Sequence, residues 1–296
     1  MANYDDLLNN GAVQTQTGRL SKDEYAAMKK AEREDVFTLS DGTAMEVSCD
    51  SDRFQQYLDV QSRFDRYSAV NVLLILAQKP EAIRLGDFDY WKKQGGYIKQ
   101  GQAAISILEP QVYSKDDGSQ GIGYNLKKVF DISQVDTRKI RTAAGTTATY
   151  SERQLLSALI SKAPVRITGV DELPGELGAV TDPETGEISV RKGMEFSDTF
   201  MNVARELSYA EMTTGSVIQV DPLFSSYCAA YLLCKKYGVD TQGFDFSDAP
   251  SVFDSMNAQA VKGELSQIRD AAEDISRRMS RQLETQARPA KNQEAR

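Results

Sequence analysis

The fold of the first half of the chain is decided by one stretch, residues 66–110, which reads RYSAVNVLLILAQKPEAIRLGDFDYWKKQGGYIKQGQAAISILEP. It opens with apolar residues at helical spacing, and Pro80 ends that pattern. After Trp91 the pattern changes to short runs separated by glycine, proline and a polar insert, which is typical of strands. Helices followed by a small sheet predict an α+β fold.

Upstream of this stretch the sequence predicts an N-terminal extension. Residues 1–18 are polar and lack apolar periodicity, so we expect an arm. Ser21 and Glu24 form a capping box, which predicts a helix through about Glu34. VFTL and AMEV flank an Asp-Gly pair at residues 41–42, which predicts a short hairpin. The apolar pattern from residue 54 to 78 then predicts two helices, broken near Tyr67 and Ser68.

Downstream, residues 137–150 are small and polar, as linkers are, and a second α+β unit follows them. We expect a helix near 152–162, a strand at 165–170, a hairpin over 178–190, and helices from about Ser197 and from Leu223 to Gly238. The last helix is predicted to be amphipathic and packed on this unit, and a coiled-coil seam between two copies is the alternative. Its apolar residues recur in a nearly alternating 4-3 pattern: Val261, Leu265, Ile268, Ala272, Ile275, Met279 and Leu283.

Composition excludes several classes of chemistry. The 296 residues contain no histidine, which rules out Ser-His-Asp and Cys-His nucleophilic sites, HExxH zinc sites and the usual two-His iron sites. The three cysteines, Cys49, Cys228 and Cys234, show no disulfide or metal spacing. The N-terminus lacks the basic and apolar parts of a signal peptide, and no apolar run reaches ~18 residues. We therefore expect a cytoplasmic protein that does not associate with membranes.

Charge is distributed unevenly along the chain. The net charge is -8, but residues 53–140 hold 13 Lys and Arg against 10 Asp and Glu, a balance of +3 that leaves -11 for the remainder. A polyanion should therefore meet the first half. Within it, cations alternate with aromatic rings between Arg66 and Lys99, a combination that holds single-stranded nucleic acid. The same pattern also fits core rings, such as Phe88 and Trp91, beside a solvated basic face.

Residues 66–110, together with VFDISQ at 129–134, resemble the N-terminal domain of the ArdC-type antirestriction family of plasmids and conjugative elements. The resemblance implies a single-stranded DNA-binding domain that tolerates many sequences, without saying which positions touch DNA. From their ring, amide and cationic groups, we choose as candidate contacts Tyr67, Asn71, Gln78, Trp91, Lys92, Lys93 and Lys99. The positions that match in order and spacing are Tyr67, Ser68, Asn71, Leu74, Ile75, Gln78, Pro80, Ala82, Trp91, Gly95, Lys99, Gly101, Ile105, Pro110, Phe130, Asp131 and Gln134.

The same resemblance implies a zincin-like second domain, in which HExxH on one helix and an acidic residue on the next bind zinc. Here Arg205, Glu206 and Tyr209 stand in the matching helix, and only Glu206 of the HExxH pattern survives. The third ligand would fall near Ser225 or Tyr227, and neither is acidic. We therefore expect an inactive metallopeptidase homologue with no bound metal or other cofactor.

The resemblance implies an accessory protein of a bacterial mobile genetic element, active in conjugation or antirestriction, whose main partner is single-stranded DNA. The alternative is a protein-interaction module in which the second domain binds a host restriction or regulatory protein. The predicted divisions are an arm with a helix and a hairpin (1–50), the DNA-binding domain (51–136), a linker (137–150), the zincin-like domain (151–285) and a disordered tail (286–296).

Overall fold

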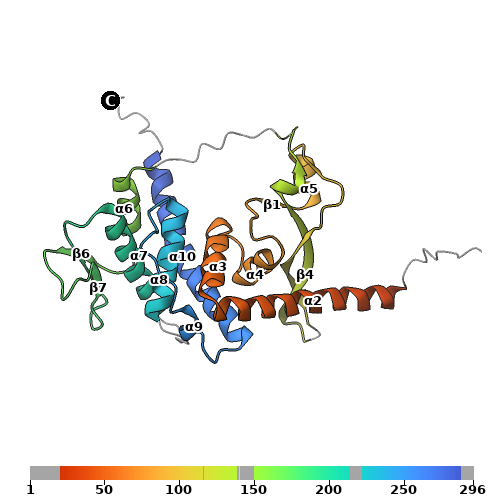
Figure 1. The fold of residues 1–296 in the computed structure, drawn as a ribbon, viewed down its shortest axis with the longest axis horizontal. Helices are drawn as coiled ribbons and strands as arrows, with labels where there is room; N and C mark the ends of the chain where they lie inside the picture. Colours follow the sequence, from red (N-terminus) through yellow and green to blue (C-terminus); the bar gives the residue numbers. More distant parts are fainter. Residues whose placement is uncertain (1–20, 116, 139, 141–149, 214–221, 288–296) are drawn as a thin grey trace, which may run out of the picture.

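The computed structural model describes residues 21–115, 117–138, 140, 150–213 and 222–287 (Figure 1). The chain has the predicted α+β class, with long helices in the middle and a small sheet at each end (Figure 1). The arm predicted at 1–18, most of the linker predicted at 137–150 and most of the predicted tail lie outside the described residues.

Helix α2 (Lys22–Cys49) corrects the predicted hairpin. Its N-terminus carries the predicted capping box, but the helix runs on through the Asp-Gly pair at 41–42. The reason is tertiary packing: one face of the helix is buried from Val36 through Ser40 and Thr43 to Val47. This helical burial outweighs the local turn preference of Asp-Gly, and Gly42 lies on the exposed side.

Helices α3 (Ser51–Arg63) and α4 (Ala69–Gln78) confirm the predicted pair and its break. The break lies at residues 64–68, where Ser68 caps α4 by accepting a hydrogen bond from the Asn71 N–H. Nearly every residue of α4 from 69 to 76 is buried, so this helix lies in the core with its neighbours around it.

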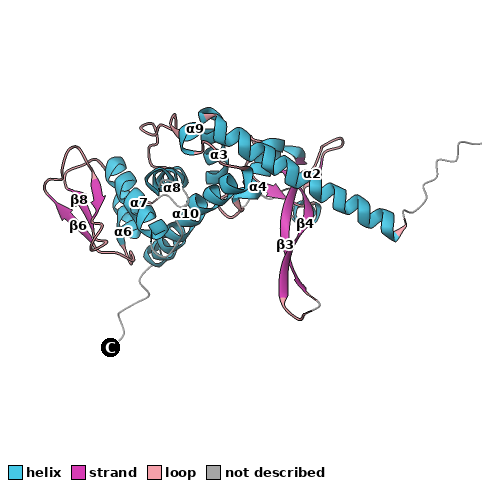
Figure 2. Ribbon diagram, turned by 90° about the horizontal axis from the view of Figure 1, so that it is seen from below, coloured by secondary structure: helices cyan, strands magenta, loops and turns pink. Residues whose placement is uncertain are grey.

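The sheet of the first half is dominated by one long hairpin, β3 (Ile105–Ser114) with β4 (Gln120–Asp131), whose end extends away from the helices (Figure 2). The sequence predicted strands in this region but not their length. Strand β1 (Leu85–Gly86) pairs with the C-terminal end of β4, at Phe130 and Asp131, and helix α5 (Phe88–Lys93) follows β1. Strand β2 (Tyr97–Ile98) pairs with β5 (Val135–Asp136), which follows a short 3-10 turn at Ile132–Gln134.

The second half matches the predicted order of elements. Helix α6 (Glu152–Ile160) is followed by a sheet of order β6-β8-β7, in which β7 and β8 form the predicted hairpin. Helix α8 ends before Gly238, whose positive φ of 70° suits a helix C-terminus. The bounds are β6 (Ile167–Val170), β7 (Ala179–Thr181), β8 (Ile188–Arg191), α7 (Phe196–Thr213), α8 (Pro222–Tyr237), α9 (Ala249–Val252) and α10 (Ala258–Ala287).

Helix α10 joins the two halves. All seven residues of its 4-3 pattern are buried, which confirms packing within the chain rather than an exposed seam. The helix contacts α6, α7 and α8 on one side and α2 and α4 on the other. One hydrophobic core therefore runs from α2 to the end of α10. Within the described ranges, no helix is long and apolar enough to cross a membrane.

Candidate nucleic-acid interface and a second cleft

Trp91 is a core residue, which corrects its choice as a base-stacking platform. Its ring is fully buried, packs on Val135 and Ile140, and donates its indole N–H to the Phe130 carbonyl at 2.9 Å. The guanidinium of Arg84 lies 5.3 Å from the ring centroid and covers it further. A base has no access to this indole.

Asn71 and Gln78 also serve the fold. The Asn71 amide donates to the Leu108 carbonyl at 2.9 Å and accepts from the Leu108 N–H at 2.8 Å. Gln78 makes the equivalent pair with Ser106, at 2.9 and 2.8 Å. Two side chains of α4 thus satisfy the free edge of β3, and neither amide is available to a base.

Basic and aromatic side chains are exposed along α5 and β2, and we call the residues Phe88, Lys92, Lys93, Tyr97 and Lys99 the α5–β2 surface. Lys92 and Lys93 end α5 and are exposed, and Lys99 is exposed although its Nζ donates to the Ser133 carbonyl at 2.8 Å. The rings beside them are Phe88, 55% exposed, and Tyr97, 57% exposed. These rings offer the stacking faces that Trp91 does not.

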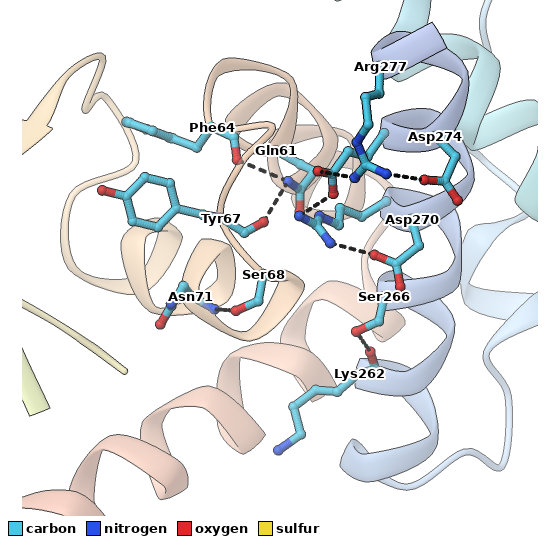
Figure 3. Close-up of polar contacts among 12 residues, drawn as sticks. Gln61, Phe64, Tyr67, Ser68, Asn71, Lys262, Ser266, Asp270, Asp274 and Arg277 are labelled. Carbon is cyan, nitrogen blue, oxygen red and sulfur yellow. Dashed lines mark hydrogen bonds and ion pairs between the residues drawn. The ribbon is translucent and has the colours of Figure 1, made fainter. Parts of the chain in front are cut away.

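Tyr67 lies apart from that surface, in a groove between the first half and α10, which we call the α4–α10 groove. Figure 3 shows Tyr67 and Ser68 on one side and Lys262 and Ser266 of α10 on the other. The volume of the groove is about 640 Å³. Its lining residues are Phe37, Arg66, Tyr67, Ser68, Val70, Asn71, Leu108, Pro110, Tyr124, Gln259, Lys262, Gly263, Ser266 and Arg269.

Three cations and three aromatic rings line this groove, and none of its lining residues is acidic. Two of these cations have carboxylate partners that do not line the groove: Asp41 pairs with Lys262, and Asp270 and Glu273 pair with Arg269. Burial raises the pKa of the Tyr67 phenol, so the ring stays neutral. Sequence reasoning identified Arg66 and Tyr67 but missed the other cations and rings, because α2, β4 and α10 are far apart in the chain.

A smaller hollow of about 320 Å³ adjoins the groove and shares Tyr67, Leu108 and Pro110 with it. Its far wall includes Tyr90 of α5. Its two acidic residues, Asp87 and Glu109, both lie within ion-pair distance of Lys127, at 3.4 and 2.8 Å. The hollow therefore leads from the groove toward α5 without an unpaired carboxylate.

Arg205, Glu206 and Tyr209 come together in a cleft of about 580 Å³ between β7, α7 and α8. Glu206 is buried, and both of its oxygens are occupied. Oε1 accepts from the Arg205 Nη2 at 3.0 Å, and Oε2 accepts from the Thr181 hydroxyl at 2.6 Å. Arg205 also donates to the Ala179 carbonyl at 3.3 Å. Arg205, Glu206 and Thr181 thus form a satisfied polar network.

The positions predicted for a third metal ligand have other partners. Tyr227 lines the cleft and accepts the Asp245 N–H at 2.9 Å. Ser225 faces away from the cleft and donates to Glu264 of α10. Within the part of the chain that the structure describes, no group of three or more Cys, Asp or Glu residues has a geometry that could hold a metal ion.

Comparison with known proteins gives one match in sequence. Residues 39–151 match the family model of the N-terminal domain of anti-restriction factor ArdC. No curated protein matches the chain. Two solved structures are similar over most of their length. The metal-free antirestriction ArdC protein from plasmid R388 is 16% identical, with a TM-score of 0.49 over 74% of this chain and 86% of that chain. Its Mn(II)-bound form is 15% identical, with a TM-score of 0.46 over 76% and 86%.

Proposed function

We propose that the chain, whose residues 39–151 match the N-terminal domain of anti-restriction factor ArdC, binds single-stranded DNA as an antirestriction-like accessory protein of a mobile genetic element. The observation that carries the proposal is the α5–β2 surface, where exposed lysines and exposed rings lie within one short segment. Cations track phosphates and rings stack on bases of any kind, so sequence-tolerant binding follows.

The local charge balance supports the same proposal. Residues 53–140 carry +3 in a chain of net charge -8, so an acidic strand is attracted to one part of the molecule and repelled by the rest. This distribution favours a bound strand of limited length over extended wrapping of duplex DNA.

A salt titration tests the proposal. Binding of labelled single-stranded and duplex oligonucleotides is measured by fluorescence anisotropy, and the affinity for single strands should fall with salt, with a slope of about -0.7 per phosphate contact. Reversing Lys92 and Lys93 to Glu should weaken binding and make this slope shallower by about 1 to 2. The matched control reverses Arg166 and Lys192, which are exposed residues of the second half. Absence of binding at low salt would refute the proposal.

We further propose that the second half is a zincin-like unit without peptidase activity. The support is Glu206, whose two oxygens are held by Arg205 and Thr181 and whose neighbouring guanidinium repels a divalent cation. Metal analysis of the purified full chain tests this. Zinc or manganese in stoichiometric amount that survives dialysis, together with peptide hydrolysis, would contradict the proposal.

A second candidate function is recognition of a host restriction or regulatory protein by the second half. The cleft favours it, because Leu177 and Leu223 lie exposed at its rim and because the chain outside 53–140 is acidic, as DNA-mimicking inhibitors are. Co-purification of the full chain with a defined restriction complex, compared with a Leu177→Asp variant, separates this function from DNA binding.

A further inference from the structure

We infer that the bound single strand also occupies the α4–α10 groove, so that helix α10 of the second half forms one wall of the DNA site. This inference rests on the proposed function and adds to it a place and a set of residues. The DNA site would then combine residues from both halves of the chain and would extend beyond residues 39–151, which match the family model.

The chemistry of the groove fits a nucleotide strand. Phe37 and Tyr124 are both partly exposed, and their rings meet edge to face with centroids 6.4 Å apart, while Tyr67 lines the same groove. Arg66 supplies positive charge, and no carboxylate lines the wall. Rings with cations and without acidic groups favour an anionic, ring-bearing ligand over an apolar peptide.

Gly263 leaves an open space in the α10 wall of the groove. It lies inside a 30-residue helix, where glycine costs about 1 kcal/mol relative to alanine. A Cβ placed on it would meet nothing within 4 Å, so packing of the fold does not require glycine here. Its lack of a side chain leaves the helix backbone bare to the groove, which suits close approach of a ligand.

Arg66 is the cation best placed to bind a phosphate. It is exposed, and no ion pair is found for it among the described residues. Lys262, by contrast, is buried and pairs with Asp41, so its charge is already balanced within the wall. Arg66 therefore supplies the unpaired positive charge that a phosphate can meet in this groove.

The adjoining hollow connects this groove with the α5–β2 surface. The two hollows share Tyr67, and the smaller one reaches Tyr90 on α5, the helix that ends in Lys92 and Lys93. A strand that leaves the groove over Tyr67 can therefore reach those lysines. One binding path explains both surfaces.

Filling the groove at Gly263 tests the inference. Gly263→Leu places a large apolar side chain in the open space, and single-strand affinity should fall by about tenfold, the loss of about one stacked base. Gly263→Ala is the matched control, because its methyl group meets nothing and should leave the affinity within about twofold. Both variants should unfold at the same or a higher temperature, since leucine and alanine favour helices.

Photocross-linking of the unaltered protein to a 4-thiothymidine strand gives a second readout that does not depend on any variant. Cross-links mapped to Tyr67 or Tyr124 support the inference. Cross-links confined to Phe88 and Tyr97 would overturn the inference and leave the proposed function intact. The same conclusion would follow if Gly263→Leu bound single strands with unchanged affinity while the reversal of Lys92 and Lys93 weakened binding. Failure of the unaltered protein to bind would instead refute the proposed function.

Discussion

The carboxamide of Asn71 and the backbone of Leu108 form a closed ring of two hydrogen bonds, 2.9 Å from Nδ2 to the carbonyl and 2.8 Å from the N–H to Oδ1. This relationship ties the central helix to the long hairpin through two buried hydrogen bonds. Substituting Asn71→Ala leaves two buried backbone groups unpaired, so the free energy of unfolding should fall by about 2 to 4 kcal/mol. Urea denaturation measures it. A loss below about 0.5 kcal/mol would mean that the backbone of β3 finds other partners.

Trp91 gives a direct optical test of its own burial, because it is the sole tryptophan in the chain. Its fluorescence should be blue-shifted, resist quenching by acrylamide and stay unchanged when single-stranded DNA binds. Trp91→Ala should destabilise the fold by about 3 to 5 kcal/mol through the cavity that it leaves. Strong quenching of the indole by bound DNA would restore Trp91 as a stacking residue.

Glu264 makes stability depend on pH in a definite direction. It is buried on α10, one of its oxygens accepts from Ser225, and the other has no hydrogen-bond partner among the described residues. Burial raises its pKa above the usual 4.5. The fold therefore favours the protonated form, a contribution fully present below the unfolded pKa and lost as pH rises through the folded one.

Glu264→Gln should remove this dependence, because the amide stays neutral at every pH. The variant should match the unaltered protein near pH 4.5, where both side chains are largely neutral, and exceed its melting temperature at pH 8. Melting curves between these values test the sign. A difference in melting temperature that does not grow with pH would show that Glu264 is solvated in the folded chain.

The paired Glu206 predicts the behaviour of its own cleft. Arg205→Met removes the charged partner of a buried carboxylate, and the stability at neutral pH should fall by about 1 to 3 kcal/mol. Recovery of part of this loss in the double variant Arg205→Met, Glu206→Gln would identify the unpaired charge as the cause. An equal loss in the single and the double variant would point to lost packing of the arginine stem instead.

Local patterns predicted much of the fold. The capping box at Ser21 and Glu24, the helix break before Ala69, the second hairpin and the 4-3 pattern of α10 are each set by residues close together in the sequence. The Asp-Gly hairpin was wrong because its residues are decided by distant packing against α4 and α10.

The candidate site was less accessible to sequence reasoning. Composition placed rings and cations in one segment but could not distinguish the buried Trp91 from the exposed Phe88 and Tyr97. The sequence also did not predict that the side chains of Asn71 and Gln78 hydrogen-bond to the backbone of β3, because these bonds depend on how α4 packs against β3. The groove is lined by Tyr67 together with residues of α10 almost two hundred positions later, which no local pattern records.

The core that passes from α2 through α10 has a practical consequence for dissecting the protein. Tyr231 reaches Asp59 at 2.7 Å, and Lys235 pairs with the same carboxylate at 2.9 Å, so links between the halves border this shared interior. A fragment ending near residue 150 would lack α8 and α10, which pack on α3 and α4. The apolar faces of α3 and α4 would then be exposed to solvent. Truncation would then report on aggregation, and only point substitutions in the intact chain can assign an activity to either half.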